Sequence, residues 1–273
     1  MPAKHRRPAV FLTGASSGIG RALALRLMEE GYEVWGSSRD KKRLESLPGL
    51  HPLELDFLKP GSVSLAWRQA LEEAGKIDIV IQNAGHGIFG SIEETDAADS
   101  RSQWVALVEG PSQLLQLAAA HMRPRNKGWI IGISSLAAEL PMPFFAHYSA
   151  GKAAFSVLLQ GLWMELKPHG VRVVDFRPGD IRTPFNDSVP RLLPPDSPYL
   201  PGAGKVWKKS CALMAVAPEP ELVAERIVSL LNGGDASPVE RCGSFFQTVL
   251  GPLGVRFLSK SVLLQLTRRY FGL

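Results

Sequence analysis

The chain has 273 residues, a formal net charge of +5 and a 45% share of hydrophobic residues, values typical of a soluble globular protein with a sizeable core. Its Lys and Arg residues are scattered rather than gathered in a stripe, which argues against nucleic-acid binding. Cys211 and Cys242 are too few for a disulfide framework and show no metal-ligand spacing, so we expect no metal site. We expect a cytoplasmic protein, because neither a secretory signal nor an apolar stretch long enough to span a membrane is recognisable.

Short apolar runs alternate with helical patterns along most of the chain. Strands are predicted at 9–12, 32–35, 53–55, 77–81, 129–133 and 171–176, with a last one near 239–242. Helices are predicted at 19–30, 63–74, 97–122, 148–166 and 219–231. This order predicts one domain over residues 1–273, with a Rossmann-like, doubly wound parallel sheet of about seven strands in a three-layer α/β/α arrangement.

The β-α-β order stops after Pro184. Residues 185–218 are rich in proline, which predicts a loop-dominated insertion that folds over a pocket as a substrate lid. Residues 245–273 mix apolar and basic side chains and are predicted to form a helical tail. Such a tail packs on its own domain or a partner subunit, or rests on a membrane surface as a peripheral contact.

A glycine-rich turn joins the first predicted strand to the first helix, at Thr13-Gly-Ala-Ser-Ser-Gly-Ile-Gly20. Glycines allow a tight turn and close backbone approach, and the following helix offers unpaired N–H groups to a pyrophosphate. This placement predicts dinucleotide binding. The expected cofactor contacts in the turn are Gly14, Ser16, Ser17, Gly18, Ile19 and Gly20.

The end of the second strand favours NADP over NAD. Ser38 stands where an acid would bind the ribose 2′-hydroxyl in a NAD site, and Arg39 follows it. Arginine binds a 2′-phosphate through charge-assisted hydrogen bonds, although Arg39 at a solvated strand end is the alternative. Asp56, after the third strand, is either an acceptor for the adenine amino group or a solvated loop acid.

Asn83-Ala84-Gly85 follows the fourth strand. These small residues let the backbone pass close under the adenine ribose, so we include all three among the cofactor contacts. The amide of Asn83 is equally suited to tying neighbouring strands together, which is a structural role.

Tyr148 and Lys152 lie four residues apart on a predicted helix, and Ser135 precedes the tyrosine by 13 residues at the end of the fifth strand. Free tyrosine titrates near pH ~10, and an ammonium group one helical turn away favours the phenolate, so we expect a lowered pKa for Tyr148. Ser135 is placed to donate a hydrogen bond to a carbonyl oxygen. The three residues together predict acid–base chemistry on a carbonyl or alcohol.

With these motifs, over roughly its first 185 residues, the chain resembles the short-chain dehydrogenase/reductase superfamily, most closely the members that act on steroids, retinoids and other lipophilic alcohols. The segment Arg177-Pro-Gly-Asp-Ile-Arg-Thr183 adds to the likeness. The resemblance implies Tyr148 as acid/base, Ser135 as the carbonyl-polarising donor and Lys152 as ribose ligand and pKa modulator. It also implies cofactor contacts from Pro178, Gly179, Ile181 and Thr183, and a homodimer or homotetramer formed through the two long helices.

Two positions depart from the family pattern. Gln82 replaces the first asparagine of Asn-Asn-Ala-Gly, which is a mild change. Leu107 stands where the family carries a catalytic asparagine, three residues before Gly110. Leucine cannot hold a water that links Lys152 to solvent, so the proton relay is either impaired or rerouted through Gln103 or Ser112.

The predicted lid and the residues before Tyr148 are rich in apolar side chains. The candidates for pocket walls are Met142, Phe144, Phe145, Phe185, Leu192, Leu193, Tyr199, Leu200, Trp207 and Met214. They either line a site for a bulky apolar substrate or simply fill a core between lid and sheet. We therefore expect an NADP(H)-dependent oxidoreductase that interconverts a carbonyl and an alcohol on a small hydrophobic substrate. A catalytically weak NADP-binding sensor or scaffold is the alternative, and a nucleotide-sugar epimerase or dehydratase is disfavoured by the apolar lid.

Overall fold

The computed structural model describes residues 7–233 and 236–273. Within them, seven parallel strands form one sheet in the order β3-β2-β1-β4-β5-β6-β7. The strands are β1 (Ala9–Leu12), β2 (Glu33–Ser38), β3 (His51–Glu54), β4 (Ile79–Gln82), β5 (Gly128–Ile133), β6 (Val171–Pro178) and β7 (Val239–Cys242). The order reverses between β1 and β4, and in such sheets this switch point opens a crevice at the carboxyl ends of the strands.

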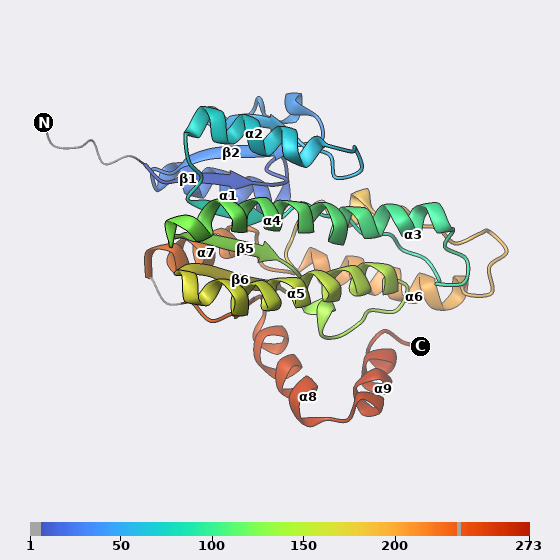
Figure 1. Cartoon of the computed structure of the whole chain (residues 1–273). Coiled ribbons are helices and arrows are strands. Elements are labelled where there is room, and N and C mark those ends of the chain that lie inside the picture. Colours follow the sequence, from blue (N-terminus) through green and yellow to red (C-terminus); the bar gives the residue numbers. More distant parts are fainter. Residues whose placement is uncertain (1–6, 234–235) are drawn as a thin grey trace, which may run out of the picture.

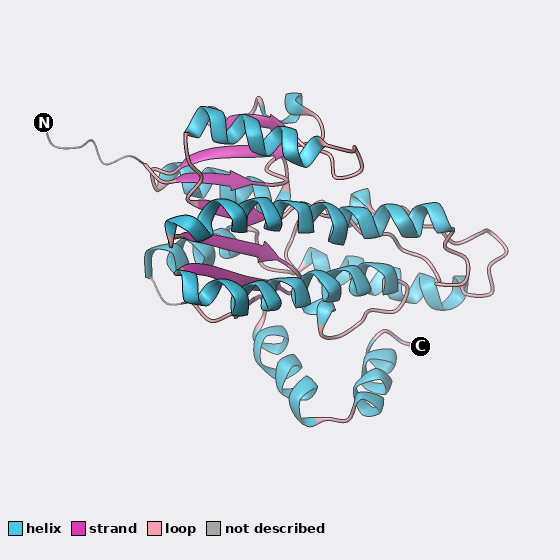
Figure 2. Ribbon diagram, in the orientation of Figure 1, coloured by secondary structure: helices cyan, strands magenta, loops and turns pink. Residues whose placement is uncertain are grey.

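Helices cover both faces of the sheet, which confirms the predicted three-layer Rossmann-like fold (Figures 1 and 2). One face carries α1 (Gly18–Glu29) and α7 (Glu221–Gly233). The other carries α2 (Ser62–Ala74), α4 (Gly110–Met122) and α5 (Ala146–Leu166).

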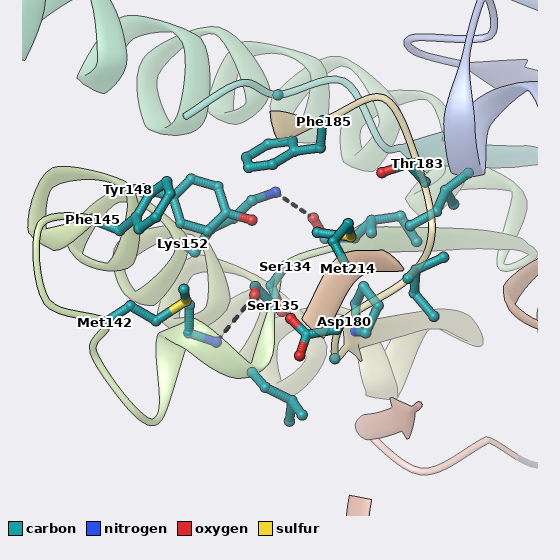
Figure 3. Close-up of a pocket in the computed structure, with 18 of the residues that line it drawn as sticks. Ser134, Ser135, Met142, Phe145, Tyr148, Lys152, Asp180, Thr183, Phe185 and Met214 are labelled. Carbon is teal, nitrogen blue, oxygen red and sulfur yellow. Dashed lines mark hydrogen bonds between the residues drawn. The ribbon is translucent and has the colours of Figure 1, made fainter. Parts of the chain in front are cut away.

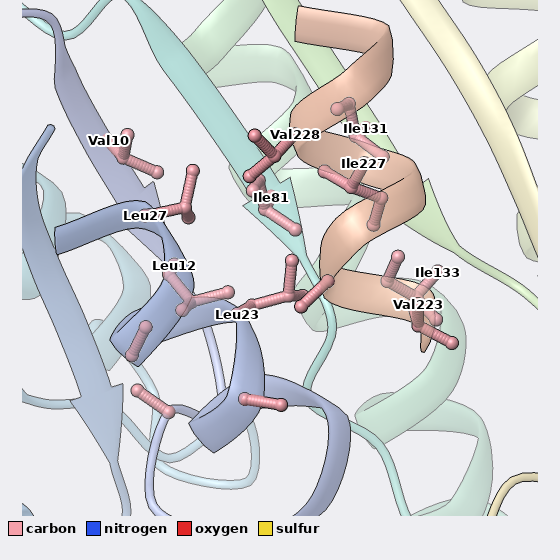
Figure 4. Packing of buried hydrophobic residues seen from close by; sticks show 14 of the residues in the cluster. Val10, Leu12, Leu23, Leu27, Ile81, Ile131, Ile133, Val223, Ile227 and Val228 are labelled. Atoms are coloured by element: carbon pink, nitrogen blue, oxygen red, sulfur yellow. The ribbon is translucent and has the colours of Figure 1, made fainter. Parts of the chain in front are cut away.

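Alternate residues of each strand enter the two halves of the core. Val10 and Leu12 of β1 pack toward α1 and α7, whereas Ala9 and Phe11 pack toward α2 and α4. Figure 4 shows the first half, with Leu23 and Leu27 of α1 facing strand residues. Both faces of β1 and β5 are buried and these strands carry no charged residue, whereas the edge strand β3 is mostly exposed.

The helix predicted over 97–122 is interrupted in the structure. It consists of α3 (Ala97–Trp104), a π-helical turn (Val105–Glu109) and α4. Pro111 has no N–H to bond the carbonyl of Leu107, and the helix widens at this point. A second π-turn (Phe246–Leu250) is also followed by a Gly-Pro sequence, Gly251-Pro252, which starts α8 (Gly251–Phe257).

Residues 185–218 differ from the predicted loop-dominated segment, because their second half forms α6 (Leu200–Ala215). Pro201 lies in the first turn of α6, where the missing N–H removes no helical hydrogen bond. The proline content therefore marked the start of a helix as well as a loop.

The end of the chain forms a helical hairpin of α8 and α9 (Lys260–Tyr270), which projects from the body of the fold (Figure 1). Its far end returns to α6, where Lys205 Nζ donates to the carbonyl of Gly272 at 3.3 Å and Lys209 Nζ to that of Tyr270. In the part of the chain that the structure describes, no helix combines the length and apolarity needed to cross a membrane.

Candidate active site

A cleft of about 1030 Å³ lies at the carboxyl ends of the strands. It is lined by the three predicted catalytic residues and by every predicted cofactor residue except Gly20, which is buried beneath the glycine turn. Residues that are distant in the sequence therefore meet at one edge of the sheet.

The glycine turn fits a bound pyrophosphate. Gly14 and Gly18 have φ values of +72° and +50°, in the left-handed region that favours glycine. A Cβ on Gly20 would lie 2.0 Å from the carbonyl oxygen of Gly14, so no side chain is possible there. The turn leads into the N-terminus of α1 without a side-chain cap, which leaves the first N–H groups of that helix available to an anion.

Asn83 ties β4 to the glycine turn. Its Nδ2 donates to the carbonyls of Thr13 at 3.0 Å and Gly14 at 3.3 Å. Thr13 Oγ1 in turn accepts from the N–H groups of Asn83 and Ala84, both at 2.9 Å. The structural role considered for Asn83 is therefore present, while Ala84 and Gly85 border the cleft.

The end of β2 presents a basic surface to the cleft. Ser38 is buried and lies 3.3 Å from Ser16, Oγ to Oγ. Arg39 is exposed, lines the cleft, and pairs with no acid among the described residues. Arg43, which the sequence analysis missed, also lines this end. It lies in the short 3₁₀ turn Lys41–Leu44, and its spacing of four residues from Arg39 was the available signal.

Asp56 lines the same end of the cleft. Its Oδ1 accepts from the N–H of Leu58 at 3.0 Å, so the carboxylate also shapes its own loop. Both roles considered for Asp56 are compatible with this position.

The predicted catalytic residues come from two neighbouring elements. Tyr148 and Lys152 lie in the first two turns of α5, and Ser135 follows β5 (Figure 3). Lys152 Nζ donates to the carbonyl of Ile133 at 2.7 Å and lies 6.0 Å from the Tyr148 ring centre. Ser135 Oγ accepts from the N–H of Ala137 at 3.0 Å, which fixes its direction.

Burial dominates the acid–base properties of this group. It raises the pKa of Tyr148 to about 12, with Ser135 opposing the rise and the charge of Asp180 adding to it. The expectation of a lowered tyrosine pKa was therefore wrong for the protein alone, because burial disfavours the phenolate more than its surroundings stabilise it. Burial also lowers the pKa of Lys152 to about 8, opposed by Asp175. Tyr148 is consequently a neutral phenol that carries its proton at neutral pH.

Leu107 occupies the π-turn beside Lys152 and is buried. A Cβ on Gly85 would lie 3.0 Å from Leu107 Cδ2 and 3.5 Å from Lys152 Nζ, so both side chains border the same small space. Leu107 also packs against Gly151 of α5. The leucine fills this space with apolar atoms.

The two alternative relay residues differ in position. Gln103 is buried and its Nε2 donates to the carbonyl of His86 at 2.6 Å, next to the Asn83–Gly85 segment. Ser112 is half-buried on α4 and does not line the cleft. Of the two, only Gln103 is bonded to a residue of the cleft wall.

The predicted apolar walls divide into two groups. Met142, Phe145, Phe185 and Met214 line the cleft. The Phe185 ring centre lies 5.5 Å from that of Tyr148. The others do not line it and pack between lid and sheet or lie near the surface, namely Phe144, Leu192, Leu193, Tyr199, Leu200 and Trp207. The expected filled core is therefore present for part of the set, and the remaining residues line the cleft.

The C-terminal hairpin supplies a further wall that the sequence did not reveal. Leu250, Leu263, Leu266 and Tyr270 line the cleft from this side. Gln247 joins this wall to the loop after β6, since its Nε2 donates to Asp180 Oδ2 at 2.5 Å and its Oε1 accepts from the Asp180 N–H at 3.1 Å.

A buried polar network lies behind the catalytic residues. Asp175 is fully buried and accepts from Ser134, from Ser156 at 2.7 Å and from Arg177 at 2.6 Å. Arg177 also bonds Glu139, which follows Ser135 on the same loop. The network therefore holds the serine loop against β6, with a buried charge that is fully paired.

Comparison with known proteins agrees with this geometry. A family model described as short chain dehydrogenase matches residues 8–192. A 3-ketodihydrosphingosine reductase of Bacteroides thetaiotaomicron is 34% identical over 179 residues, which is 66% of this chain and 66% of that protein, just under two thirds of its length. Short-chain dehydrogenase PC-15 of Penicillium crustosum is 30% identical over 238 residues, covering 83% of this chain and 85% of that one. The crystal structure of a short-chain dehydrogenase from Streptomyces avermitilis has a TM-score of 0.85 and 26% identity, covering 99% of both chains.

A doubly wound parallel sheet with a glycine turn at its switch point and a Tyr–Lys pair in the crevice defines a Rossmann-type oxidoreductase. The family match covers most of the chain, including the turn, Ser135 and the Tyr–Lys pair. This protein belongs to the short-chain dehydrogenase family, as the resemblance of its motifs predicted.

Replacement of Lys152 by methionine should change the pH dependence of stability. Between about pH 8 and the ordinary lysine pKa of 10.5, the folded protein binds fewer protons at Lys152 than the unfolded chain. Burial of the charged Lys152 therefore lowers the free energy of unfolding fully below this pH range, and the effect disappears above it. The free energy of unfolding of Lys152→Met relative to wild type should therefore be greatest near pH ~7 and fall toward pH ~10. Urea unfolding at several pH values measures this difference. The exposed Lys127→Met is the control, and a pH-independent difference for Lys152→Met would contradict the prediction.

Proposed function

We propose that this protein is an NADP(H)-dependent oxidoreductase that interconverts a carbonyl and an alcohol on a hydrophobic substrate. The observation that carries the proposal is the neutral phenol of Tyr148 in the cleft, next to Ser135 and Lys152. In reduction, Tyr148 donates its proton to the carbonyl oxygen, while Ser135 donates a hydrogen bond to the same oxygen. The nicotinamide cofactor supplies the hydride when it is bound. In oxidation the steps run in reverse, so Tyr148 must first lose its proton, and the resulting phenolate accepts the proton of the alcohol.

The cofactor contacts follow the lining of the cleft. The glycine turn would hold the pyrophosphate and Lys152 the nicotinamide ribose. Pro178, Gly179, Ile181 and Thr183 would lie beside the nicotinamide. We propose a preference for NADP, because the unpaired Arg39 and nearby Arg43 suit a 2′-phosphate, and no acid stands at Ser38 to repel it. Solved structures that share the fold at 23% and 24% identity hold NADH in one case and NADP in another, so the fold alone leaves this preference open.

A hydrophobic substrate suits the remaining walls, which come from the residues before Tyr148, the lid and the C-terminal hairpin. The Bacteroides relative is named for the reduction of 3-ketodihydrosphingosine, and we include that compound among the candidate substrates.

A catalytically weak NADP-binding sensor is the second candidate function. Leu107 favours it, because apolar atoms fill the space beside Lys152 where a relay water would be needed. Tight NADPH binding by the wild-type protein without turnover of any ketone would support this alternative.

We also propose a peripheral contact between the C-terminal hairpin and an anionic membrane surface. Phe245 and Phe257 are 69% and 73% exposed. Residues 241–273 contain five Lys or Arg residues and no acid. Exposed apolar side chains among basic ones suit the interface of an anionic bilayer, where lipid-like substrates reside.

A cytoplasmic location and a homodimer or homotetramer complete the proposal. The two cysteines are unpaired in the described residues, as expected in a reducing compartment. Exposed apolar side chains on α5, among them Val157 and Met164, suit a subunit interface.

Tyr148→Phe tests the catalytic proposal. Loss of the proton donor should lower kcat by about 10²–10⁴-fold on a panel of lipophilic ketones, measured as NADPH oxidation. The affinity for NADPH, measured by fluorescence titration, should stay near that of wild type. Tyr32→Phe is the matched control. Tyr32 follows α1, its hydroxyl donates to Asn232 Oδ1, and it lies outside the cleft. Full activity in Tyr148→Phe would remove the mechanism.

Arg39→Leu tests the cofactor preference. Removal of a charge-assisted contact to the 2′-phosphate should lower kcat/KM for NADPH by about 10–100-fold and change that for NADH far less. The exposed Arg68→Leu, which removes the same charge outside the cleft, serves as the control. An equal loss of kcat/KM with NADPH and NADH would show that Arg39 does not bind the 2′-phosphate.

Vesicle sedimentation tests the membrane contact. The protein should bind vesicles that contain phosphatidylglycerol more strongly than pure phosphatidylcholine vesicles, and Phe245→Ser/Phe257→Ser should lose this binding. Leu65→Ser/Ile92→Ser is the control, since these residues are 62% and 68% exposed elsewhere on the surface. Absence of binding, together with a smaller oligomer for the double phenylalanine variant in light scattering, would instead assign the hairpin surface to a second copy of the chain.

A further inference from the structure

Asp180 is a carboxylate in the cleft to which the proposed chemistry gives no role. It follows Pro178-Gly179 at the end of β6, and Figure 3 shows it beside Ser135. It lines the cleft, and its charge contributes to the raised pKa of Tyr148. Asp180 therefore lies near the reacting end of the site.

The carboxylate is held in place but its charge is not neutralised. Gln247 binds Oδ2 and the Asp180 N–H, which fixes the orientation of the side chain. No Lys or Arg in residues 7–233 and 236–273 forms an ion pair with Asp180. Oδ1 has no hydrogen bond to any of these residues. Gln247 therefore orients the Asp180 carboxylate through Oδ2, and Oδ1 remains available to a ligand.

The other acids that line the cleft are accounted for differently. Glu139 is paired with Arg177 and Arg241. Asp56 lies at the Arg39 end and accepts from Leu58. Asp187 is exposed at the start of the lid. Asp180 is thus the sheltered acid close to Ser135.

The surroundings of Asp180 are apolar on the side of the C-terminal wall. Phe246 and Leu250, which belong to the same π-turn as Gln247, line the cleft. Burial raises the pKa of Asp180, as expected for a carboxyl group that lacks a cationic neighbour. A charge in such a place is costly unless an opposite charge joins it.

The position of Gln247 indicates which ligand the carboxylate faces. Gln247 belongs to the π-turn that starts the C-terminal wall, whereas the glycine turn, Arg39 and Asn83 come from the β1, β2 and β4 ends. Asp180 is therefore tied to the wall assigned to the substrate. Ser135 and Tyr148 are the proposed contacts of the carbonyl oxygen, and the charge of Asp180 acts on Tyr148. A cationic group close to the carbonyl would therefore lie within the field of this carboxylate.

We infer that Asp180 is a specificity residue that binds an ammonium group on the carbon next to the reacting carbonyl, so that the preferred substrates are long-chain 2-amino ketones and the matching amino alcohols. This inference rests on the proposed function and names the substrate class of the same site. The ammonium group pairs with Asp180, and the alkyl chain lies along the apolar walls of lid and hairpin.

Three ketones of equal chain length test the inference: one with a 2-amino group, one with a 2-hydroxyl group and one unsubstituted. The wild-type enzyme should prefer the amino ketone by at least about tenfold in kcat/KM. Asp180→Asn should remove most of this preference, mainly through KM of the amino ketone. Asp187→Asn, which makes the same change at an exposed residue of the cleft mouth, should keep it. NADPH titration of each variant reports whether the cofactor site has folded.

A second measurement needs no variant. A simple long-chain amine should inhibit reduction of the unsubstituted ketone by the wild-type enzyme at a concentration at least about tenfold lower than the alcohol of equal length. Equal inhibition by both compounds would overturn the inference.

The outcomes separate the two proposals. Three results would overturn the role of Asp180 and leave the proposed function standing. The wild-type enzyme could reduce ketones without preferring the amino ketone, or Asp180→Asn could lower kcat/KM equally for all three ketones. The third result is loss of the preference in Asp187→Asn and not in Asp180→Asn. Failure to reduce any of a broad panel of ketones with NADPH bound would overturn the proposed function itself.

Discussion

The buried ammonium group of Lys152 is the constraint on which the site depends. It is held by the carbonyl of Ile133 at the end of β5, and Asp175 of β6 favours its charge from behind. Both partners are in place only when β5 and β6 are paired and α5 is packed across them. The active site is therefore a product of the completed sheet, because no local segment of the chain holds the lysine, its acceptor and its counter-charge together.

The same burial sets the protonation of both catalytic groups in opposite directions. It raises the pKa of Tyr148 and lowers that of Lys152, which in each case favours the neutral form. A site arranged in this way binds its ligands with a protonated phenol already facing the cleft. Among the described residues, Arg39 at one end of the cleft and Asp180 in its wall form no ion pair, and the proposals above use these two charges.

The sequence predicted the sheet, its two helical layers and the catalytic trio because each depends on a local pattern. Strands buried on both faces are continuous apolar runs, and Tyr148 and Lys152 are one helical turn apart. Other features depend on contacts between distant segments. The hydrogen bond between Gln247 and Asp180 joins residues 67 positions apart, and no local sequence pattern around either residue predicts it. The helix at Leu200–Ala215 was missed because proline signals a helix start and a loop alike. The pKa of Tyr148 was misjudged because the sequence shows the spacing to Lys152 but not the depth of burial.

Only part of the chain matches the family model, so the match indicates a class of reaction but not a substrate. The family match ends at residue 192, after the cofactor turn and the catalytic trio but before α6 and the C-terminal hairpin. Those later elements supply Met214, Gln247 and Leu250 to the cleft. Leu107, by contrast, lies inside the matched region yet departs from the family pattern, and it packs against Gly85 and Gly151. The chain thus combines the tyrosine and lysine of the family motif with apolar atoms in the space beside the lysine. With apolar atoms beside Lys152, a proton would reach Tyr148 either by way of Gln103, which is bonded to the cleft residue His86, or from the open side of the cleft.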